Sequence, residues 1–289
     1  MGYELWTSPV TGYRRTGTRL RELRHLFEDG ITAQSIHEPL QSCPSTPNAI
    51  EIAELLRDRD FDVAGVKEES SGEVIGFVFR DSLKTGIVRS HLQKMTSEHL
   101  ISDATPLANL LSIFKTRNHA FVLVGQYVRG IITRADLNKP PLRVYLFGLI
   151  SLLEMHLTYW VTKSYPKDSW RERISVPRLA KAKKLLEDRQ ARGQQTDLVD
   201  CLQFCDKRDL ILGLDDLRDS LGLGQKAATR KFLVKAEKLR DLLAHSQKDL
   251  TEGSSWVELV EVVDLVETVV HKSDELVERN ATQPAQPKE

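Results

Sequence analysis

The first half of the chain repeats itself, and this repeat limits the possible folds more than any other feature of the sequence. Residues 74–83 align with residues 128–137 after a shift of 54 positions, and Val, Gly, Arg and Leu coincide in the two copies. A short apolar run precedes each copy, at 62–66 and at 121–124, and its length is typical of a buried strand. A repeat of this period predicts two copies of one supersecondary unit.

An amphipathic helix pattern precedes the strands of each copy. It covers about 49–59 in the first copy and about 106–116 in the second, with Pro47 and Pro106 at the helix starts. Proline is tolerated there because its missing N–H group would have no partner in the first turn. The predicted order of elements is therefore helix, strand, strand, helix, and this order occurs twice.

The second copy ends in polar residues where its last strand is expected to give way to a helix. Gly130 and Ile132 lie in this strand, Thr133 ends it, and Asp136 lies in the first turn of the next helix. The Thr133 hydroxyl can donate to a phosphate or accept from a ribose, and the free N–H groups of a first helical turn favour anions. Asp136 can accept hydrogen bonds from a pair of ribose hydroxyls.

The pattern of a glycine, two apolar residues, threonine, two residues and aspartate resembles the ligand motif of CBS-domain pairs, also called Bateman modules. The resemblance covers residues 17–140, with repeats at about 17–90 and 91–140. It implies that Gly130, Ile132, Thr133 and Asp136 hold an adenine nucleotide such as AMP or ATP as a regulatory ligand. A purely structural pair, in which Thr133 and Asp136 only cap the helix, stays open.

The first copy departs from this motif. Phe79 stands where the second copy has Thr133, and Ser82 stands where it has Asp136. Asp81 is one residue out of register and would point elsewhere. We therefore expect one nucleotide per pair of repeats.

The second half of the chain shows only helical patterns. Apolar residues at helical spacing and the positions of Pro and Gly predict five helices, at about 142–163, 177–192, 198–212, 225–247 and 255–279. Short connections predict an up-and-down bundle at 141–279. The expected fold class is α+β, in which two β-α sandwich repeats precede an all-α domain. Residues 1–16 form a separate N-terminal segment, and residues 280–289 read as a disordered tail.

One motif in the fourth predicted helix carries chemistry. Arg240 is followed by Asp241 and, five positions after the arginine, by His245. Asp241 and His245 are four positions apart and share a helix face, so the carboxylate can orient the imidazole. Arg240 lies about 140° around the helix from His245 at 100° per residue, so one helix does not easily aim both groups at one phosphate.

This motif, late in the penultimate long helix of a small bundle, resembles the signature of the HEPN family. The resemblance implies a homodimer whose two helices share one site, and metal-independent RNA cleavage that leaves 2′,3′-cyclic phosphate ends. His245 would act as acid or base and Arg240 would neutralise the phosphate. Glu154 is expected to face the same site. The alternative is that Arg240 and Asp241 form surface ion pairs and that His245 only favours the helix dipole.

Charge is unevenly distributed along the second half. Residues 163–192 hold ten Lys and Arg against four acids, and residues from 249 onward hold ten acids against three bases. The basic segment is expected to attract RNA, although a solvated helix face has the same composition.

Cysteine content and hydropathy indicate the compartment. Three cysteines, at 43, 201 and 205, do not suit a disulfide framework and favour a reducing environment. No metal-ligand spacing is present, and no metal site is predicted. The longest apolar run, 144–161, is interrupted by Glu154 and His156, so we expect no membrane association. The sequence thus predicts a cytoplasmic protein.

Together these patterns predict a nucleotide-regulated endoribonuclease with RNA, and not DNA, as its substrate. The architecture resembles CRISPR-associated ribonucleases in which a ring-nucleotide sensor precedes a HEPN effector, which suggests a toxin or a role in stress or phage defence. One alternative is a non-catalytic CBS-domain regulator whose helical domain mediates dimerisation or partner binding. Another is a HEPN antitoxin target that a nucleotidyltransferase modifies.

Overall fold

The computed structural model describes residue 17, residues 19–245 and residues 249–282. It divides into two units, which we call the repeat unit (residues 27–142) and the helical unit (the described residues on either side). Each unit is described by itself. The predicted N-terminal segment 1–16 and most of the predicted tail, 283–289, lie outside the described residues. The first residues of that tail, up to Thr282, continue the last helix.

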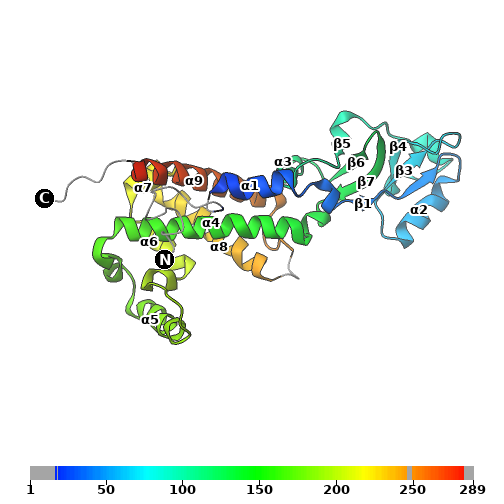
Figure 1. The fold of residues 1–289 in the computed structure, drawn as a ribbon. Helices are drawn as coiled ribbons and strands as arrows, with labels where there is room; N and C mark the ends of the chain where they lie inside the picture. Colours follow the sequence, from blue (N-terminus) through cyan, green and yellow to red (C-terminus); the bar gives the residue numbers. More distant parts are fainter. Residues whose placement is uncertain (1–16, 18, 246–248, 283–289) are drawn as a thin grey trace. The chain divides into compact units, whose positions relative to one another are not determined.

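The repeat unit contains the same series of elements twice (Figure 1). The first copy comprises β2 (Ser42–Pro44), α2 (Ala49–Asp58), β3 (Val63–Lys67), β4 (Val74–Phe79) and a 3-10 helix (Arg80–Ser82). The second comprises β5 (Leu100–Ser102), α3 (Leu107–Ile113), β6 (His119–Val124), β7 (Tyr127–Thr133) and a 3-10 helix (Ala135–Asn138). The predicted repeat is thus present in the fold.

Strand pairing is also the same in both copies. β2 runs parallel to β3, which pairs antiparallel with β4, and β5, β6 and β7 repeat this pattern. A short strand, β1 (Glu38–Pro39), adds to β7, so the second sheet has the order β1-β7-β6-β5. The three-residue strands β2 and β5 were not predicted, because runs of this length carry no periodicity.

Side-chain burial explains the helices of the repeats. In α2 the buried residues Ala49, Ala53 and Leu56 recur at helical spacing, and the Asn48 side chain caps the helix by accepting from the Ile50 amide at 2.9 Å. The helix predicted to follow the last strand of each copy is only a 3-10 turn in both places.

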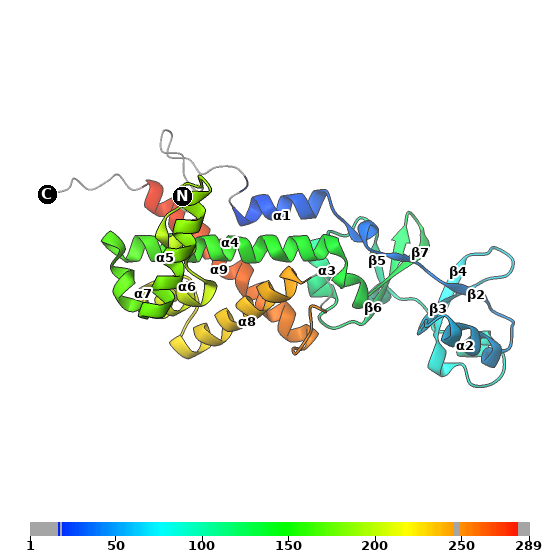
Figure 2. The ribbon, with the colours of Figure 1, turned by 90° about the horizontal axis from the view of Figure 1, so that it is seen from below.

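Among the described residues, the regular structure of the helical unit is helical. Its α-helices are α1 (Leu20–Asp29), α4 (Pro140–Ser164), α5 (Val176–Ala191), α6 (Phe204–Ile211), α7 (Asp215–Ser220), α8 (Lys226–Ala244) and α9 (Trp256–Thr282). Helix α9 runs along α4 in Figure 1 and crosses it obliquely in Figure 2. Hydrogen bonds join them, as from the Tyr145 hydroxyl to Glu267 at 2.6 Å.

The predicted helix at 198–212 is broken in the structure. A 3-10 helix (Leu198–Cys201) precedes α6, and the chain is extended at Leu202 and Gln203. The cause is a capping box, in which the Asp206 side chain accepts from the Gln203 amide at 3.0 Å and starts a new helix. The predicted end of α8, at residue 247, lies outside the described residues.

Helix α1 begins in the helical unit, whereas the sequence predicted the repeats from residue 17 onward. The backbone amide of Leu20 donates to Oδ2 of Asp274 on α9 at 3.0 Å. Leu23 lies so close to Gly148 on α4 that a Cβ atom there would be 3.0 Å from its Cδ1. These contacts explain why residues before 27 group with the C-terminal helices.

Helix α4 is the one described helix that is long and apolar enough to cross a membrane. Its best 18-residue window has a mean hydropathy of 1.4, but 61% of that window is buried inside the structure. Such burial is also typical of a core helix in a soluble protein.

Candidate functional sites

The turn after β7 is fixed by one carboxylate. Oδ2 of Asp136 accepts from the backbone amide of Thr133 at 2.7 Å and from its hydroxyl at 2.9 Å. Oδ1 of Asp136 lies 2.9 Å from Nζ of Lys139, and the Asp136 side chain is 11% exposed. Burial alone would lower the pKa of Lys139, but its hydrogen bonds to Glu38 and Asp136 raise it. Asp136 therefore already caps this turn and holds a permanent cation beside it.

A cleft of about 810 Å³ opens beside Thr133. It is lined by Asp62, Val63, Phe79, Glu98, His99, Thr116, Arg117, Asn118, His119 and Thr133. Two pairs of these residues occupy equivalent places in the repeats, because Val63 pairs with Phe79 across the first hairpin and His119 pairs with Thr133 across the second. The cleft thus lies where the strand ends of both copies meet.

The four predicted ligand residues have different places in this geometry. Thr133 lines the cleft, whereas Asp136 lies behind it through its bonds to Thr133. Ile132 is fully buried and belongs to the core. At Gly130 a Cβ atom would be 2.4 Å from Cδ2 of His37, so this glycine allows close packing of the segment before β1. Of the four predicted ligand residues, Thr133 is thus the one that lines the cleft, and ligand binding by the other three stays a prediction.

Aromatic rings form one side of the cleft. The His119 ring lies with its centroid 5.5 Å from that of Phe79 and 5.4 Å from that of Phe121. Burial, and secondarily the charge of His99, lower the pKa of His119. Nε2 of His119 is buried and makes no hydrogen bond among the described residues. A neutral imidazole with an unused polar atom and a flat neighbour suits a heterocyclic ligand.

Arg117 supplies a cation to the same cleft. Its side chain makes no ion pair or hydrogen bond with other described residues, so it can meet an anion without first leaving a partner. The sequence did not indicate Asp62, His99, Arg117 or His119. The repeat itself held the signal, since Asp62 directly precedes β3 and Asn118 directly precedes the equivalent strand β6.

The first copy lacks the polar turn, as its sequence suggested. Phe79 fills the place of Thr133, and its ring packs edge-on against Phe77 at 5.4 Å. The Ser82 hydroxyl donates to the Phe79 carbonyl at 2.6 Å, and no carboxylate caps this turn in the described structure. The Asp81 side chain is 94% exposed and lies beside Arg80. It does not take the role that Asp136 has in the second copy.

A second group of polar residues surrounds Arg240 on α8. Its Nη2 atom donates to Oδ1 of Asp241 at 3.1 Å, and Nη1 lies 3.6 Å from Oε2 of Glu154 on α4. Glu154 also accepts from Nζ of Lys207, a side chain that is 5% exposed, at 2.9 Å. Burial alone would lower the pKa of Arg240, but Asp241 and Glu154 raise it. The structure thus brings Glu154 to Arg240, where the sequence placed it.

His245 lies apart from this group. It is the C-terminal cap of α8, with φ −113° and ψ 98°, and it is exposed. Its carbonyl accepts from Nη2 of Arg143 at 2.9 Å. The expected orientation of His245 by Asp241 is wrong, because the Asp241 carboxylate turns to Arg240 and no described hydrogen bond joins it to the imidazole. Helix α8 ends at Ala244, so His245 is not helical and does not share a helix face with Asp241.

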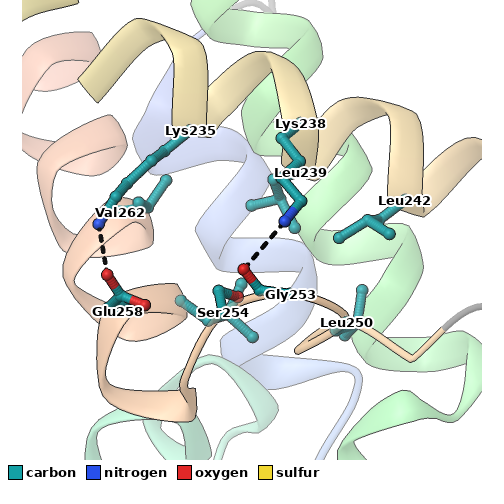
Figure 3. Close-up of a pocket in the computed structure, with 10 residues that line it drawn as sticks. Lys235, Lys238, Leu239, Leu242, Leu250, Gly253, Ser254, Glu258 and Val262 are labelled. Atoms are coloured by element: carbon teal, nitrogen blue, oxygen red, sulfur yellow. Dashed lines mark hydrogen bonds and ion pairs between the residues drawn. The ribbon is translucent and has the colours of Figure 1, made fainter. Parts of the chain in front are cut away.

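The opposite side of α8 borders a small apolar cavity of about 150 Å³ (Figure 3). Its walls include the buried residues Leu239, Leu242 and Leu259. Two lysines close its edge, since Lys235 pairs with Glu258 at 2.9 Å and Lys238 donates to the Gly253 carbonyl at 3.0 Å. This cavity belongs to the core face of α8 and not to the face that carries Arg240.

Comparisons with known proteins bear on the repeat unit alone. No family model and no curated protein matches the chain. Among solved structures, the CBS domains of a transcriptional regulator from Streptococcus pneumoniae are 18% identical, with a TM-score of 0.33, over 38% of this chain and 98% of that one. CBSX2 in complex with AMP is 16% identical, with a TM-score of 0.34, over 39% of this chain and 97% of that one. A structure of the CBS-pair protein CBSX2 from Arabidopsis thaliana is also similar.

A further similar structure is the CBS domain of a bacterial CNNM/CorC family Mg²⁺ transporter in complex with ATP. It is 17% identical, with a TM-score of 0.33, over 40% of this chain and 92% of that one. The matched part is N-terminal, and the neighbours are CBS-domain pairs.

Proposed function

We propose that the repeat unit is a CBS-domain pair that senses one adenine nucleotide in the cleft beside Thr133. The observation that carries the proposal is the meeting of both strand ends at one cleft of about 810 Å³, with the Thr133–Asp136 turn on one copy only. Solved CBS-domain structures similar to this chain hold AMP and ATP. A single polar turn favours one ligand per chain.

The side chains suggest how the ligand would lie. The adenine ring would rest against the aromatic side formed by Phe79 and His119, and a phosphate would meet Arg117. A ribose hydroxyl would donate to the Thr133 hydroxyl oxygen, which would keep its own hydrogen bond to Oδ2 of Asp136.

Calorimetric titration of the full chain with AMP and with ATP tests the proposal. We expect a stoichiometry near one and a loss of affinity of roughly two- to tenfold in Thr133→Val, since the ribose loses its acceptor and a neutral hydrogen bond contributes about 0.5–1.5 kcal/mol. Thr85→Val, at an exposed threonine of the same unit outside the cleft, is the matched control. Equal affinity of the two variants for both nucleotides would exclude this site.

We infer a second function, RNA cleavage, for the helical unit, and we propose that nucleotide binding regulates it. The supporting observation is that Arg240 and His245 both reach solvent from α8, with side-chain exposure of 30% for Arg240. A composite site would take the guanidinium from one protomer of a homodimer and the imidazole from the other. RNA would be cut through attack of its 2′-OH, without a metal ion.

An RNA incubation in EDTA tests this second function. We expect fragments with 2′,3′-cyclic phosphate ends from the wild type, and none from His245→Ala or Arg240→Ala. His271→Ala is the control, because His271 is also an exposed histidine of the helical unit, beside Glu275 at 3.5 Å. Cleavage that continues in His245→Ala would remove this histidine from the mechanism. Complete inactivity of the wild type with every nucleotide would leave the non-catalytic regulator as the function of the chain.

A further inference from the structure

Helix α5 contributes little to the core of the helical unit. Of its 16 residues only Ala182 is buried. Figure 1 shows α5 at the margin of the helical unit. A helix that is polar on most sides gains little stability from packing. Its side chains are therefore available for a surface function.

The charges on and before α5 are mostly positive. Residues 163–192 hold ten Lys and Arg against four acids. Arg178 is held by Asp206 at 3.2 Å and Asp209 at 3.0 Å, and Arg189 donates to the Asp200 carbonyl at 3.2 Å. These contacts fasten α5 to the segment 198–209 and use two of its cations.

Three further cations of α5 have no such role. Lys181, Lys183 and Lys184 are exposed, and none makes an ion pair or hydrogen bond in the part of the chain that the structure describes. Lys181 and Lys184 are three positions apart, so they are neighbours on the helix surface. Together with Arg178 they line a cavity of about 220 Å³, whose lining also holds the carboxylates of Asp188 and Asp206. Asp206 pairs with Arg178, so the lining keeps two lysines without a described ion pair against the one carboxylate of Asp188.

The apolar residues of α5 do not suit a membrane surface. The large exposed ones are Val176, at 81%, and Leu185, at 38%. They are nine positions apart, which places them about 180° from each other around the helix at 100° per residue. Insertion into a bilayer requires one continuous apolar face, which these two residues do not form.

We propose that α5 is a binding surface for the phosphodiester backbone of a single-stranded nucleic acid, centred on Lys181 and Lys184. The lysines would neutralise phosphates and release their condensed counterions. This binding gives the helical unit a nucleic-acid partner. It would take place whether or not the chain binds a nucleotide or cleaves RNA. RNA and DNA share the backbone, so the test includes both.

Fluorescence anisotropy with a labelled 20-nucleotide RNA, in the His245→Ala background so that cleavage cannot consume the probe, measures this binding between 50 and 300 mM NaCl. We expect Lys181→Gln with Lys184→Gln to weaken binding about tenfold at low salt. The slope of log K against log salt should shrink by about 1.4, since each phosphate contact on a single strand contributes about 0.7. A DNA oligonucleotide of the same sequence shows whether the ribose matters.

Lys226→Gln with Lys231→Gln removes the same charge from two exposed lysines of α8 and should leave the slope unchanged. An unchanged slope in the α5 variant would overturn the proposal. So would tighter binding of the protein to phosphatidylserine vesicles than to either oligonucleotide, lost in the α5 variant. Titration of the same variants with AMP separates this result from a failure of the nucleotide site.

Discussion

Nε2 of His156 lies 3.2 Å from Oδ1 of Asp274, inside the core between α4 and α9. Nδ1 of His156 lies 2.6 Å from the Ser273 hydroxyl, which also accepts from Nε1 of Trp160 at 2.6 Å. The hydroxyl hydrogen is therefore directed to Nδ1, and Nε2 faces the carboxylate of Asp274 as a close charge contact. The other oxygen of Asp274 accepts from the Leu20 amide, so the chain of bonds also holds α1.

Loss of the imidazole should strongly destabilise the helical unit. In His156→Leu the carboxylate of Asp274 loses its contact with the imidazole and the Ser273 hydroxyl loses its acceptor, and a buried polar group left unsatisfied costs about 1–3 kcal/mol. Urea unfolding followed by circular dichroism measures the difference. Asp274→Asn removes the charge but keeps the shape and a hydrogen-bonding oxygen, so it should cost less. Equal midpoints for the wild type and His156→Leu would show that this chain of bonds adds nothing to stability.

Two glycines of the repeat unit should differ in their tolerance of a methyl group. A Cβ atom at Gly76 would lie 2.4 Å from the backbone oxygen of Gln93, and one at Gly130 would lie 2.4 Å from the His37 ring. A side chain can turn away, whereas a backbone carbonyl that pairs with Phe77 cannot. We expect Gly76→Ala to lower the free energy of unfolding by roughly 1–3 kcal/mol and Gly130→Ala by less. Thermal unfolding of both variants checks the order, which a larger loss in Gly130→Ala would contradict.

His119 should make the repeat unit sensitive to acid. Because its pKa is lowered in the folded chain, the unfolded chain binds more protons as pH falls below the ordinary value of about 6.5. Stability is therefore full above that value and falls until pH passes the lowered folded pKa. His119→Phe keeps the aromatic packing but cannot take up a proton. Urea midpoints at pH 7.5, 6.5 and 5.5 should fall more for the wild type, and parallel curves would contradict this.

How much the sequence predicts depends on the range of the interactions. The repeat is visible because Gly76 and Gly130, and the strands around them, recur after 54 positions. The helices α4, α8 and α9 follow from their periodic apolar residues. The break before α6 depends on one local hydrogen bond of Asp206, which competes with a continuous helix and leaves no periodic signal.

The sequence predicts only the local part of the cleft. Thr133 and Asp136 form a local motif and can be recognised in one stretch of sequence. Arg117 and His119 reach the cleft only because β6 pairs with β7 and the two copies meet. The place of α1 depends on the contact of Leu20 with Asp274, 254 positions away. Contacts at that distance have no signature in composition or spacing.

A second nucleotide site should appear when the first copy is given the polar turn. In Phe79→Thr with Ser82→Asp, the new carboxylate would cap the new threonine as Asp136 caps Thr133. The lost Phe79 ring lowers stability, since it packs against Phe77 and His119. Because the adenine of the first site is proposed to rest against Phe79, calorimetric titration with AMP should show weaker binding at that site and a stoichiometry that rises from one toward two. Phe79→Leu with wild-type Ser82 is the control, and a stoichiometry that stays at one would contradict the prediction.

Variants of the two acids beside Arg240 distinguish a catalytic role of Arg240 from a structural one. If Arg240 serves a phosphate, its present carboxylates compete with RNA, and loss of either should strengthen RNA binding severalfold. Asp241 is 62% exposed and contacts no other described cation, so Asp241→Asn should strengthen binding at almost no cost in stability. Glu154→Gln should strengthen binding as well, but it also removes the charge partner of the buried Lys207 and should lower the free energy of unfolding by about 1–3 kcal/mol.

Anisotropy titrations with RNA and urea unfolding of the same two samples measure both effects. Stability that falls only in Glu154→Gln, with tighter RNA binding in both, is the pattern of a guanidinium that exchanges carboxylates for phosphate. Unchanged RNA affinity in Asp241→Asn together with lost stability in Glu154→Gln is the pattern of an ion-pair cluster that only joins α4, α6 and α8. The second result would exclude Arg240 from RNA binding, because removal of the charge of Asp241, its most exposed ion-pair partner, would then leave RNA affinity unchanged.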